Sequence, residues 1–171
     1  MKKFFILTLI SAVFLSFNSF AQQDKSKRVS PPDSVSQKIK SGATITINYS
    51  KPSVKGRKIG TEIAQYGKVW RTGANEATTF QVTKDVKVEG KALPAGKYSL
   101  YTIPGEKEWV VIFNKNWKQW GTQYKEADDQ LRVTVAPEKA ESFNEQMQFK
   151  IAKHGEVSLS WGDVEVEFEV K

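Results

Sequence analysis

The chain has 171 residues and a net charge of +7 at pH 7, with 26 lysines and arginines against 19 aspartates and glutamates. It contains no cysteine and a single histidine, which excludes disulfides, thiolate chemistry and cysteine-based metal sites. A chain of this length is expected to form one domain with a sizeable hydrophobic core.

The first 21 residues have the order of a secretory signal peptide. A basic start at 1–3 precedes an almost entirely apolar run at 4–17, and Ser19 and Ala21 place small residues around a cleavage site. The apolar run is shorter than the roughly 20 residues that cross a bilayer. We therefore expect cleavage after Ala21, an exported protein that is periplasmic or secreted, and no transmembrane segment in the mature chain. Removal of the two lysines in this segment leaves 24 basic against 19 acidic residues, a net charge of +5.

Residues 22–33 are polar, contain Pro31 and Pro32, and are expected to form a flexible tail. From residue 34 onward, apolar and polar residues alternate in short stretches that turn residues separate, a pattern typical of strands with one buried face. The alternation covers 43–49, 131–135, 147–151, 157–161 and 164–170.

A further hairpin is predicted at 97–103 and 109–113, around Pro104 and Gly105. Together these strands predict an all-β fold, a single antiparallel β-sandwich of roughly 8–10 strands over residues 34–171. At most two short helices are expected, at 60–65 and 117–129.

Positive charge is concentrated between residues 51 and 71. One acidic residue, Glu62, stands there against six basic residues, so the segment carries +5; the six are Lys51, Lys55, Arg57, Lys58, Lys68 and Arg71. The two arginines suit planar contacts to carboxylate, phosphate or sulfate, although a solvated basic loop is an equal alternative. Aromatic residues are not interleaved here as in nucleic-acid-binding modules, so we expect no nucleic-acid partner.

The stretch YGKVWRTGANEATTF, residues 66–80, follows this segment directly. Its polar groups allow two interpretations. In one, Arg71 pairs with Glu76 and Asn75 caps the backbone of a turn. In the other, these groups face a polar pocket with Trp70 as its floor. Joined to the basic segment, the second interpretation predicts a site for an anionic or polyhydroxyl, glycan-like ligand, made of Arg57, Lys58, Trp70, Arg71, Asn75 and Glu76.

The remaining titratable residues point to no metal, cofactor or catalytic triad. His154 lies in a turn and is expected at the surface, without the partners that a triad needs. Glu165, Glu167 and Glu169 project from one strand as a ladder, which is expected to be solvated or paired with lysines on a neighbouring strand and cannot converge on one ion. Asp128 and Asp129 lie in a polar loop and are weak candidates for a cation site.

Two other functions stay open. Glu76 is the weak candidate for catalysis, as the acid or base of a glycosidase-like hydrolase, which requires a second carboxyl across a cleft. The chain is alternatively a structural partner in an envelope assembly, with an exposed apolar patch around Trp117 and Trp120.

Three long motifs resemble one family of small exported bacterial proteins, catalogued as domain of unknown function 2911 (DUF2911). The motifs are YSKPSVKGRKIG, YGKVWRTGANEATTF and VEGKALPAGKYSLYTIPGEKEWVVIFN, and the resemblance extends over about 31–171. The family has no established activity, so the resemblance implies none. It implies that KGRK and GKVWRTGANEATT belong to the family's common pattern, which favours a pocket built from both. The chain departs from that pattern at Lys51, where arginine is usual, and near Gly60, where an apolar residue is usual.

Overall fold

The structure, a computed structural model, describes residues 24–171, so the predicted signal peptide at 1–21 lies outside the described residues. The described chain contains ten β-strands and two short 3-10 turns, η1 (Lys25–Lys27) and η2 (Glu126–Asp128). The predicted all-β, antiparallel fold is thus confirmed. No helix in this part of the chain is long and apolar enough to cross a membrane.

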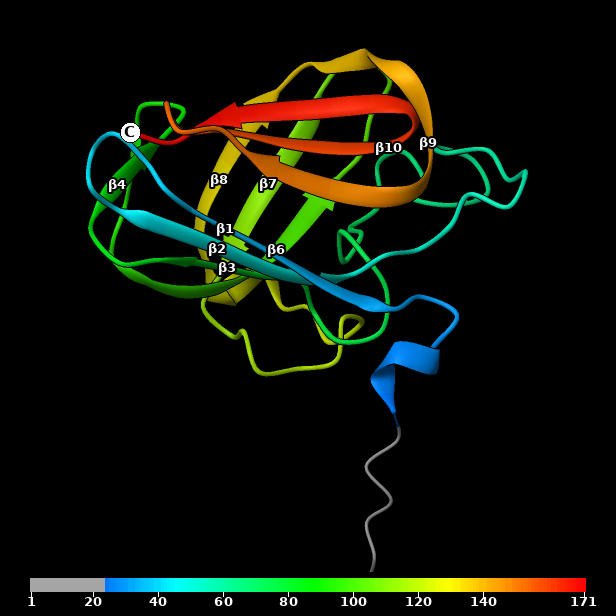
Figure 1. Ribbon diagram of the computed structural model, residues 1–171, viewed down its shortest axis with the longest axis horizontal. Helices are drawn as coiled ribbons and strands as arrows, with labels where there is room; N and C mark the ends of the chain where they lie inside the picture. Colours follow the sequence, from blue (N-terminus) through cyan, green and yellow to red (C-terminus); the bar gives the residue numbers. More distant parts are fainter. Residues whose placement is uncertain (1–23) are drawn as a thin grey trace, which may run out of the picture.

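The first layer of the sandwich is a six-stranded antiparallel sheet (Figure 1). Its strands lie in the order β1 (Pro32–Lys38), β2 (Thr44–Ser50), β3 (Thr79–Val82), β6 (Gly96–Ile103), β7 (Trp109–Asn114) and β8 (Asp129–Val135). β1 begins two residues before the predicted start of the domain. The long connection between β2 and β3, which holds the basic segment, projects at one end of the sandwich.

The second layer is built around a long hairpin of β9 (Pro137–Ile151) and β10 (Glu156–Glu169), with the short hairpin of β4 (Val86–Val88) and β5 (Lys91–Leu93) beside it. β4 joins the end of β10, since Lys87 and Lys171 exchange backbone hydrogen bonds of 2.7 and 2.9 Å. On the other side, the Met147 N–H of β9 donates to the Pro52 carbonyl at 3.0 Å. The connection after β2 is therefore attached to the second layer.

The core lies between the two layers and follows the period-two pattern of the sequence. Ile45, Ile47 and Phe80 of the first layer are fully buried. The Phe80 ring meets Phe113 edge to face at 5.0 Å, and Phe168 of β10 lies 6.1 Å from Phe80. Burial of one such aromatic side chain stabilises the fold by about 1.5–3 kcal/mol.

β10 bends back on itself at Gly162. The Val170 N–H donates to the Gly155 carbonyl at 2.9 Å, although roughly 50 Å of extended chain separates the two residues. The pairing with β9 shifts register on both sides of Gly162, which has a φ of 61°. The runs 157–161 and 164–170, predicted as two strands, therefore form two halves of β10 that lie beside each other.

The predicted helix at 60–65 is wrong. The Lys58 carbonyl accepts hydrogen bonds from the N–H groups of Glu62 and Ile63, as in one helical turn, but Gly60 and Ala64 have φ values of 92° and 45°. Those left-handed residues end any helix at once.

The predicted helix at 117–129 is reduced to the single 3-10 turn η2. The segment before η2 is held in a non-helical conformation because the Ala77 N–H donates to the Gln119 carbonyl at 3.1 Å, and Glu76 and Trp120 form a β-bridge. Contacts with a distant loop thus override the local preference.

The closure of β10 can be tested at Gly155. A Cβ atom there overlaps the Val170 carbonyl oxygen, and the φ of 112° is strained for any other residue. Gly90 has a φ of 76°, but a Cβ added there would meet no atom within 4 Å, so Gly90→Ala isolates the backbone strain. We expect Gly90→Ala to lower the free energy of unfolding by about 1 kcal/mol and Gly155→Ala by at least about 1 kcal/mol more. Urea denaturation measures both, and equal losses would contradict the close approach at Gly155.

Candidate functional site

The loop that contains RTGAN, residues 71–75 of the stretch 66–80, is fixed by backbone and hydroxyl contacts. Trp70 and Thr102 exchange backbone hydrogen bonds of 2.7 and 2.9 Å, which attach the start of the loop to β6. Thr72 is fully buried, its hydroxyl donates to the Thr102 hydroxyl at 3.2 Å, and its carbonyl accepts from the Thr78 hydroxyl at 2.8 Å. Thr72 and Asn75 have φ values of 49° and 61°, uncommon for residues other than glycine. Such enforced backbone strain concentrates at functional sites.

Arg71 and Glu76 do not pair with each other. The Glu76 carboxylate contacts Lys25 Nζ at 3.1 Å and Arg28 Nη1 at 2.7 Å, both from the segment that precedes β1. The Arg71 guanidinium donates from Nε to the Gly73 carbonyl at 3.4 Å. Its aliphatic stem lies against Gly121, where a Cβ would overlap the Arg71 side chain. The two residues therefore serve different environments.

Arg71 lines a pocket of about 340 Å³, which we call the basic pocket. Arg57, Trp70 and Lys55 line it as well, together with Val29, Ser30, Pro52, Ser53, Ile63, Ala64, Gly73, Ala74 and Trp161. No acidic residue is found among these described lining residues. Among residues 24–171, none of its three cationic side chains is within ion-pair distance of a carboxylate. The Glu145 carboxylate accepts a hydrogen bond from the Lys55 backbone N–H at 2.9 Å, which offsets part of the charge at Lys55. The charges of Arg57 and Arg71 are not offset by an ion pair within the described chain.

Two stacked indoles contribute the apolar part of the basic pocket. The Trp70 and Trp161 rings lie 5.2 Å apart and are nearly parallel, with an interplanar angle of 10°. Trp109 meets Trp70 edge to face at 6.3 Å. The Trp161 indole N–H is buried and has no hydrogen-bond partner within the described residues, which costs stability. Contacts with Trp161 and Trp109 therefore fix the position of the Trp70 ring.

Arg57 marks the border between the basic pocket and a second depression. Its guanidinium donates to the Val54 carbonyl at 3.0 Å and to the Ser53 carbonyl at 2.7 Å, which fixes the side chain. It also lines a groove of about 550 Å³ that contains Lys58. Exposed rings of Tyr66 and Phe143 lie in that groove. Lys58 therefore lines this groove and not the basic pocket.

Asn75 and Glu76 hold the segment before β1. The Asn75 side chain donates to the Ser30 carbonyl at 3.1 Å, which places Ser30 at the rim of the basic pocket. Glu76 lines a different cleft, of about 360 Å³, with Lys25 and Trp117. Among the described residues of that lining, no second carboxyl accompanies Glu76. These contacts join part of the segment predicted as a tail to the loop.

Of the six predicted site residues, the structure brings Arg57, Trp70 and Arg71 together in one pocket. Lys58 adjoins them, whereas Asn75 and Glu76 act on the segment before β1. Lys55 and Trp161 complete the pocket and were not predicted. Lys55 belonged to the basic segment without a distinguishing signal, and Trp161 showed only the alternation of a core strand.

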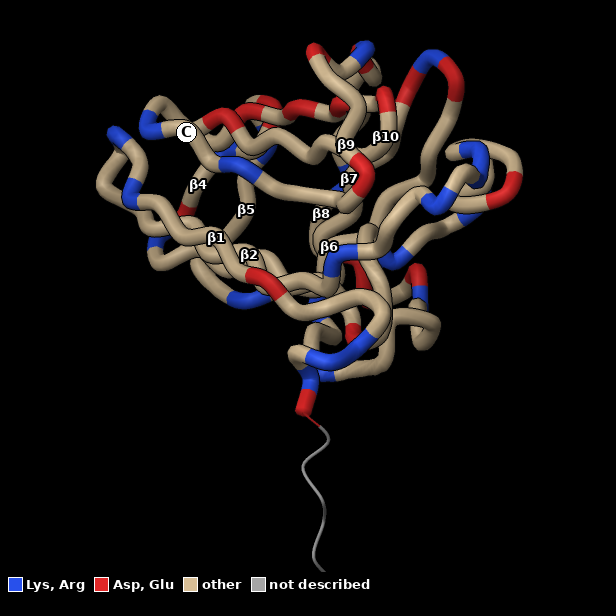
Figure 2. Tube along the Cα trace, turned by 45° about the vertical axis from the view of Figure 1, so that its right-hand side comes forward, with Lys and Arg blue, Asp and Glu red and all other residues tan. Residues whose placement is uncertain are grey.

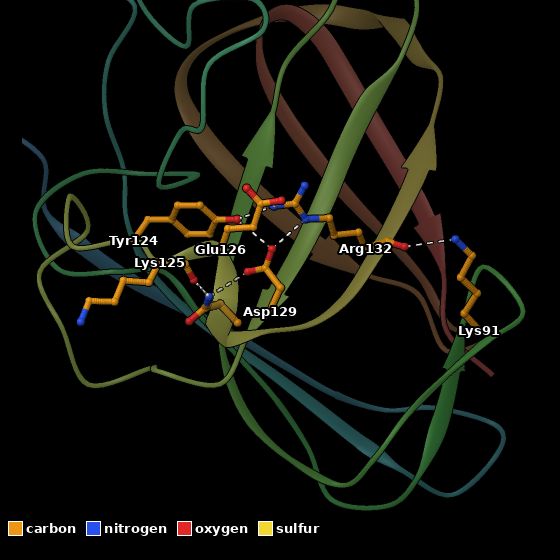
Figure 3. A network of polar contacts seen from close by, with 7 residues as sticks. Lys91, Tyr124, Lys125, Glu126, Asp129 and Arg132 are labelled. Carbon is orange, nitrogen blue, oxygen red and sulfur yellow. Dashed lines mark hydrogen bonds and ion pairs between the residues drawn. The ribbon is translucent and has the colours of Figure 1, made fainter.

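A second polar cluster, at the start of β8, is fully satisfied within itself (Figure 3). Asp129 accepts hydrogen bonds of 2.7 Å from the Tyr124 hydroxyl and from Arg132, and one of 2.8 Å from Asn114. Burial, and then the neighbouring Asp129 carboxylate, raise the pKa of Tyr124 to about 12. These three hydrogen bonds to Asp129 secure the loop before β8. Residues 24–171 contain no group of three acidic or histidine side chains arranged to hold a metal ion.

Comparison with known proteins yields one family. The family described as "Protein of unknown function (DUF2911)" matches residues 30–170. Neither the curated proteins nor the solved structures contain a significant match.

The ion pairs of Glu76 predict a pH dependence of stability. Burial raises the pKa of this carboxyl, but hydrogen bonds from its own backbone N–H, Arg28 and Lys25 lower it by more, from 4.5 to about 2. Because the pKa is lower in the folded state, Glu76 stabilises the fold above pH 4.5, and this contribution is lost as the pH falls toward 2. The side chain is 42% exposed, so solvent screening limits the contribution to about 1 kcal/mol or less.

Urea denaturation of Glu76→Gln measures this contribution. Near neutral pH the variant is expected to be less stable than the parent protein, and the difference should shrink as the pH falls below about 4. Glu108→Gln is the control, since Glu108 is exposed and forms no ion pair within 24–171. A difference that is the same at all pH values would refute the assignment.

Proposed function

The chain belongs to the DUF2911 family, and we propose that it is a non-catalytic binding protein whose basic pocket holds an anionic, glycan-like ligand. The observation that carries the proposal is a hollow with three cations, a tryptophan floor and no acidic residue among its described lining. Pockets of about 300–1,000 Å³ with an apolar wall and a few converging polar groups are typical of small-molecule sites.

Arg71 is the expected anchor for the anionic group. Its single contact, from Nε to Gly73, leaves both terminal amino groups free of partners within the described chain. A guanidinium in this state can donate two parallel hydrogen bonds to a carboxylate, sulfate or phosphate. The packing of its stem on Gly121 and the strained loop hold it in one orientation, which lowers the entropy cost of binding.

Arg57 and Lys55 add positive charge to the same pocket. Two nitrogens of Arg57 are engaged by the Ser53 and Val54 carbonyls, so its position is set while its charge stays available. The indole of Trp70, supported by Trp161, offers apolar surface to the carbon skeleton of the ligand. An acidic sugar combines a carboxylate or sulfate, which suits the cations, with a carbon skeleton, which suits the indole.

We extend the proposal to an exported location, periplasmic or secreted, on the strength of the signal pattern in residues 1–21. Acidic glycans of cell envelopes and secreted polymers are met in that location. The lysines and arginines of the connection 51–78 (blue in Figure 2), which outnumber its two glutamates, support attraction of such polyanions at low salt.

The hydrolase alternative receives less support. A glycosidase needs a protonated carboxyl and a second carboxyl across a cleft. Glu76 has a pKa of about 2, and the described lining of its cleft supplies no second carboxyl. The structural-partner alternative retains two exposed rings, since Trp117 and Trp120 are 39% and 46% exposed. Lys97 Nζ lies 4.4 Å from the centre of the Trp117 ring, which reduces the apolar character of that surface.

Arg71→Gln tests the proposed function. Isothermal titration calorimetry with trigalacturonate, a sulfated disaccharide and inorganic phosphate measures anion binding, with neutral maltotriose for comparison. We expect at least one anionic compound to bind, maltotriose to bind more weakly, and Arg71→Gln to weaken binding about 10-fold or more, as is usual for a charged hydrogen bond. Quenching of tryptophan fluorescence should accompany binding because Trp70 and Trp161 line the pocket.

The matched control is Lys68→Gln, which removes the same charge from the same connection outside the pocket lining. Equal losses for Arg71→Gln and Lys68→Gln would indicate diffuse attraction and contradict a defined site. If no anion in the panel raises the melting temperature of the parent protein by more than it raises that of Arg71→Gln, the proposal fails.

A further inference from the structure

The bend of β10 creates another depression, on the outer side of the second layer, which is distinct from the groove that contains Lys58. We call it the acidic groove. It has a volume of about 570 Å³. Its charged lining consists of five glutamates and two lysines, a net charge of −3, in a chain whose total charge is +7; these residues are Glu138, Glu141, Glu156, Glu165, Glu167, Lys139 and Lys150. Figure 2 shows acidic positions (red) gathered along β9 and β10.

The two halves of β10 face the acidic groove with different residues. In the first half Val157, Leu159 and Trp161 point into the core, so Ser158 and Ser160 point outward. The irregular pairing at Gly162 shifts the alternation by one, and Glu165 and Glu167 then point outward in the second half. The Ser160 hydroxyl donates to Glu165 Oε1 at 2.8 Å across the groove, which confirms that both halves contribute to it.

Repulsion between carboxylates is retained in the acidic groove. Glu165 stands directly opposite Glu138 in the β9–β10 ladder, where like charges destabilise a pair of strands. Burial, and then the charges of Glu156, Glu165 and Glu138, raise the pKa of Glu167. The sequence had predicted a solvated ladder or one paired with lysines. In the described chain Glu169 Oε1 lies 2.7 Å from Nζ of Lys171, which belongs to the same segment and not to a neighbouring strand as predicted. Glu165 and Glu167 form no ion pair within residues 24–171.

A hydroxyl without a protein partner lies at the floor of the acidic groove. Ser158 is 8% exposed and shares the outward face of Ser160. No hydrogen bond of its side chain is found within residues 24–171, whereas Ser160 on the same face is satisfied by Glu165. The Ser158 hydroxyl is not among the buried polar atoms that lack a partner, so it is accessible from the groove and free to hydrogen-bond a ligand there.

We propose that the acidic groove binds an aliphatic polyammonium ligand, either a free polyamine or the lysine side chains of a basic peptide. A metal ion is disfavoured because no three acidic or histidine side chains of the described chain converge on one point. The groove also exceeds the size of an ion. An ammonium group donates three hydrogen bonds, to Ser158 and to neighbouring carboxylates, and Ile151 and Ala152 lie along the groove to cover methylene groups.

Titration calorimetry of the purified protein with spermine at low salt tests this inference. We expect binding of one spermine per chain, weakened about 10-fold or more in the double variant Glu165→Gln, Glu167→Gln. Ser158→Ala changes no charge and should weaken binding several-fold if the hydroxyl contacts the ligand. Glu108→Gln removes one exposed carboxylate outside the groove and should leave the affinity unchanged.

A trilysine peptide in the same titration distinguishes the two sources of the ligand. Tighter binding of trilysine assigns the groove to a basic peptide, and tighter binding of spermine assigns it to a free polyamine. Absence of binding for both overturns the proposal, as does an equal effect of Ser158→Ala, the double variant and Glu108→Gln. Arg71→Gln serves as a separate check, because spermine binding should survive the loss of the basic pocket.

Stability provides a second readout that does not require a ligand. Because Glu165→Gln removes the repulsion from Glu138, the variant is expected to have a higher urea midpoint than the parent protein. Spermine should raise the midpoint of the parent protein and have less effect on the variant. A variant that is less stable, together with an unchanged spermine affinity, would contradict the inference.

Discussion

The reversal of β10 at Gly162 is the constraint on which the rest of the structure depends. It allows the hydrogen bond from Val170 to Gly155 and places the second half of β10 beside β4, which completes the second layer. Trp161 immediately precedes the bend, and its ring stacks on the ring of Trp70. The Gly162 backbone also lies so close to Ile59 that a Cβ would be 2.9 Å from its side chain. One bend therefore supports both the connection after β2 and the β9–β10 hairpin.

The two proposed sites have opposite charge and share this support. The basic pocket lies where the connection after β2 meets Trp161, and its three cationic side chains form no ion pair within the described chain. The acidic groove lies on the outer side of the same bend, where the two halves of β10 bring glutamates together. By contrast, the Glu76 carboxylate is paired with Lys25 and Arg28.

Unfavourable features are also concentrated at these places. The loop beside the basic pocket has left-handed φ values at Thr72 and Asn75, and Trp161 buries an unsatisfied N–H. The acidic groove contains facing glutamates, with the hydroxyl of Ser158 beneath them. Strain, an unsatisfied donor and like charges each lower stability in the absence of a ligand. By contrast, the Tyr124, Asp129 and Arg132 cluster is satisfied within itself, as expected of a group that serves the fold alone.

By itself, the sequence determined the all-β class, most of the strands and the chemical character of the segment that carries Arg57 and Arg71. These properties follow from local alternation and composition, which depend on neighbours a few residues away. The tertiary structure decided that Glu76 pairs with Lys25 and Arg28, that Trp161 backs Trp70, and that 60–65 and most of 117–129 are not helical. It also turned a ladder of glutamates into one wall of a groove. Such outcomes depend on contacts between residues far apart in the chain, and local patterns carry no record of which distant surfaces meet.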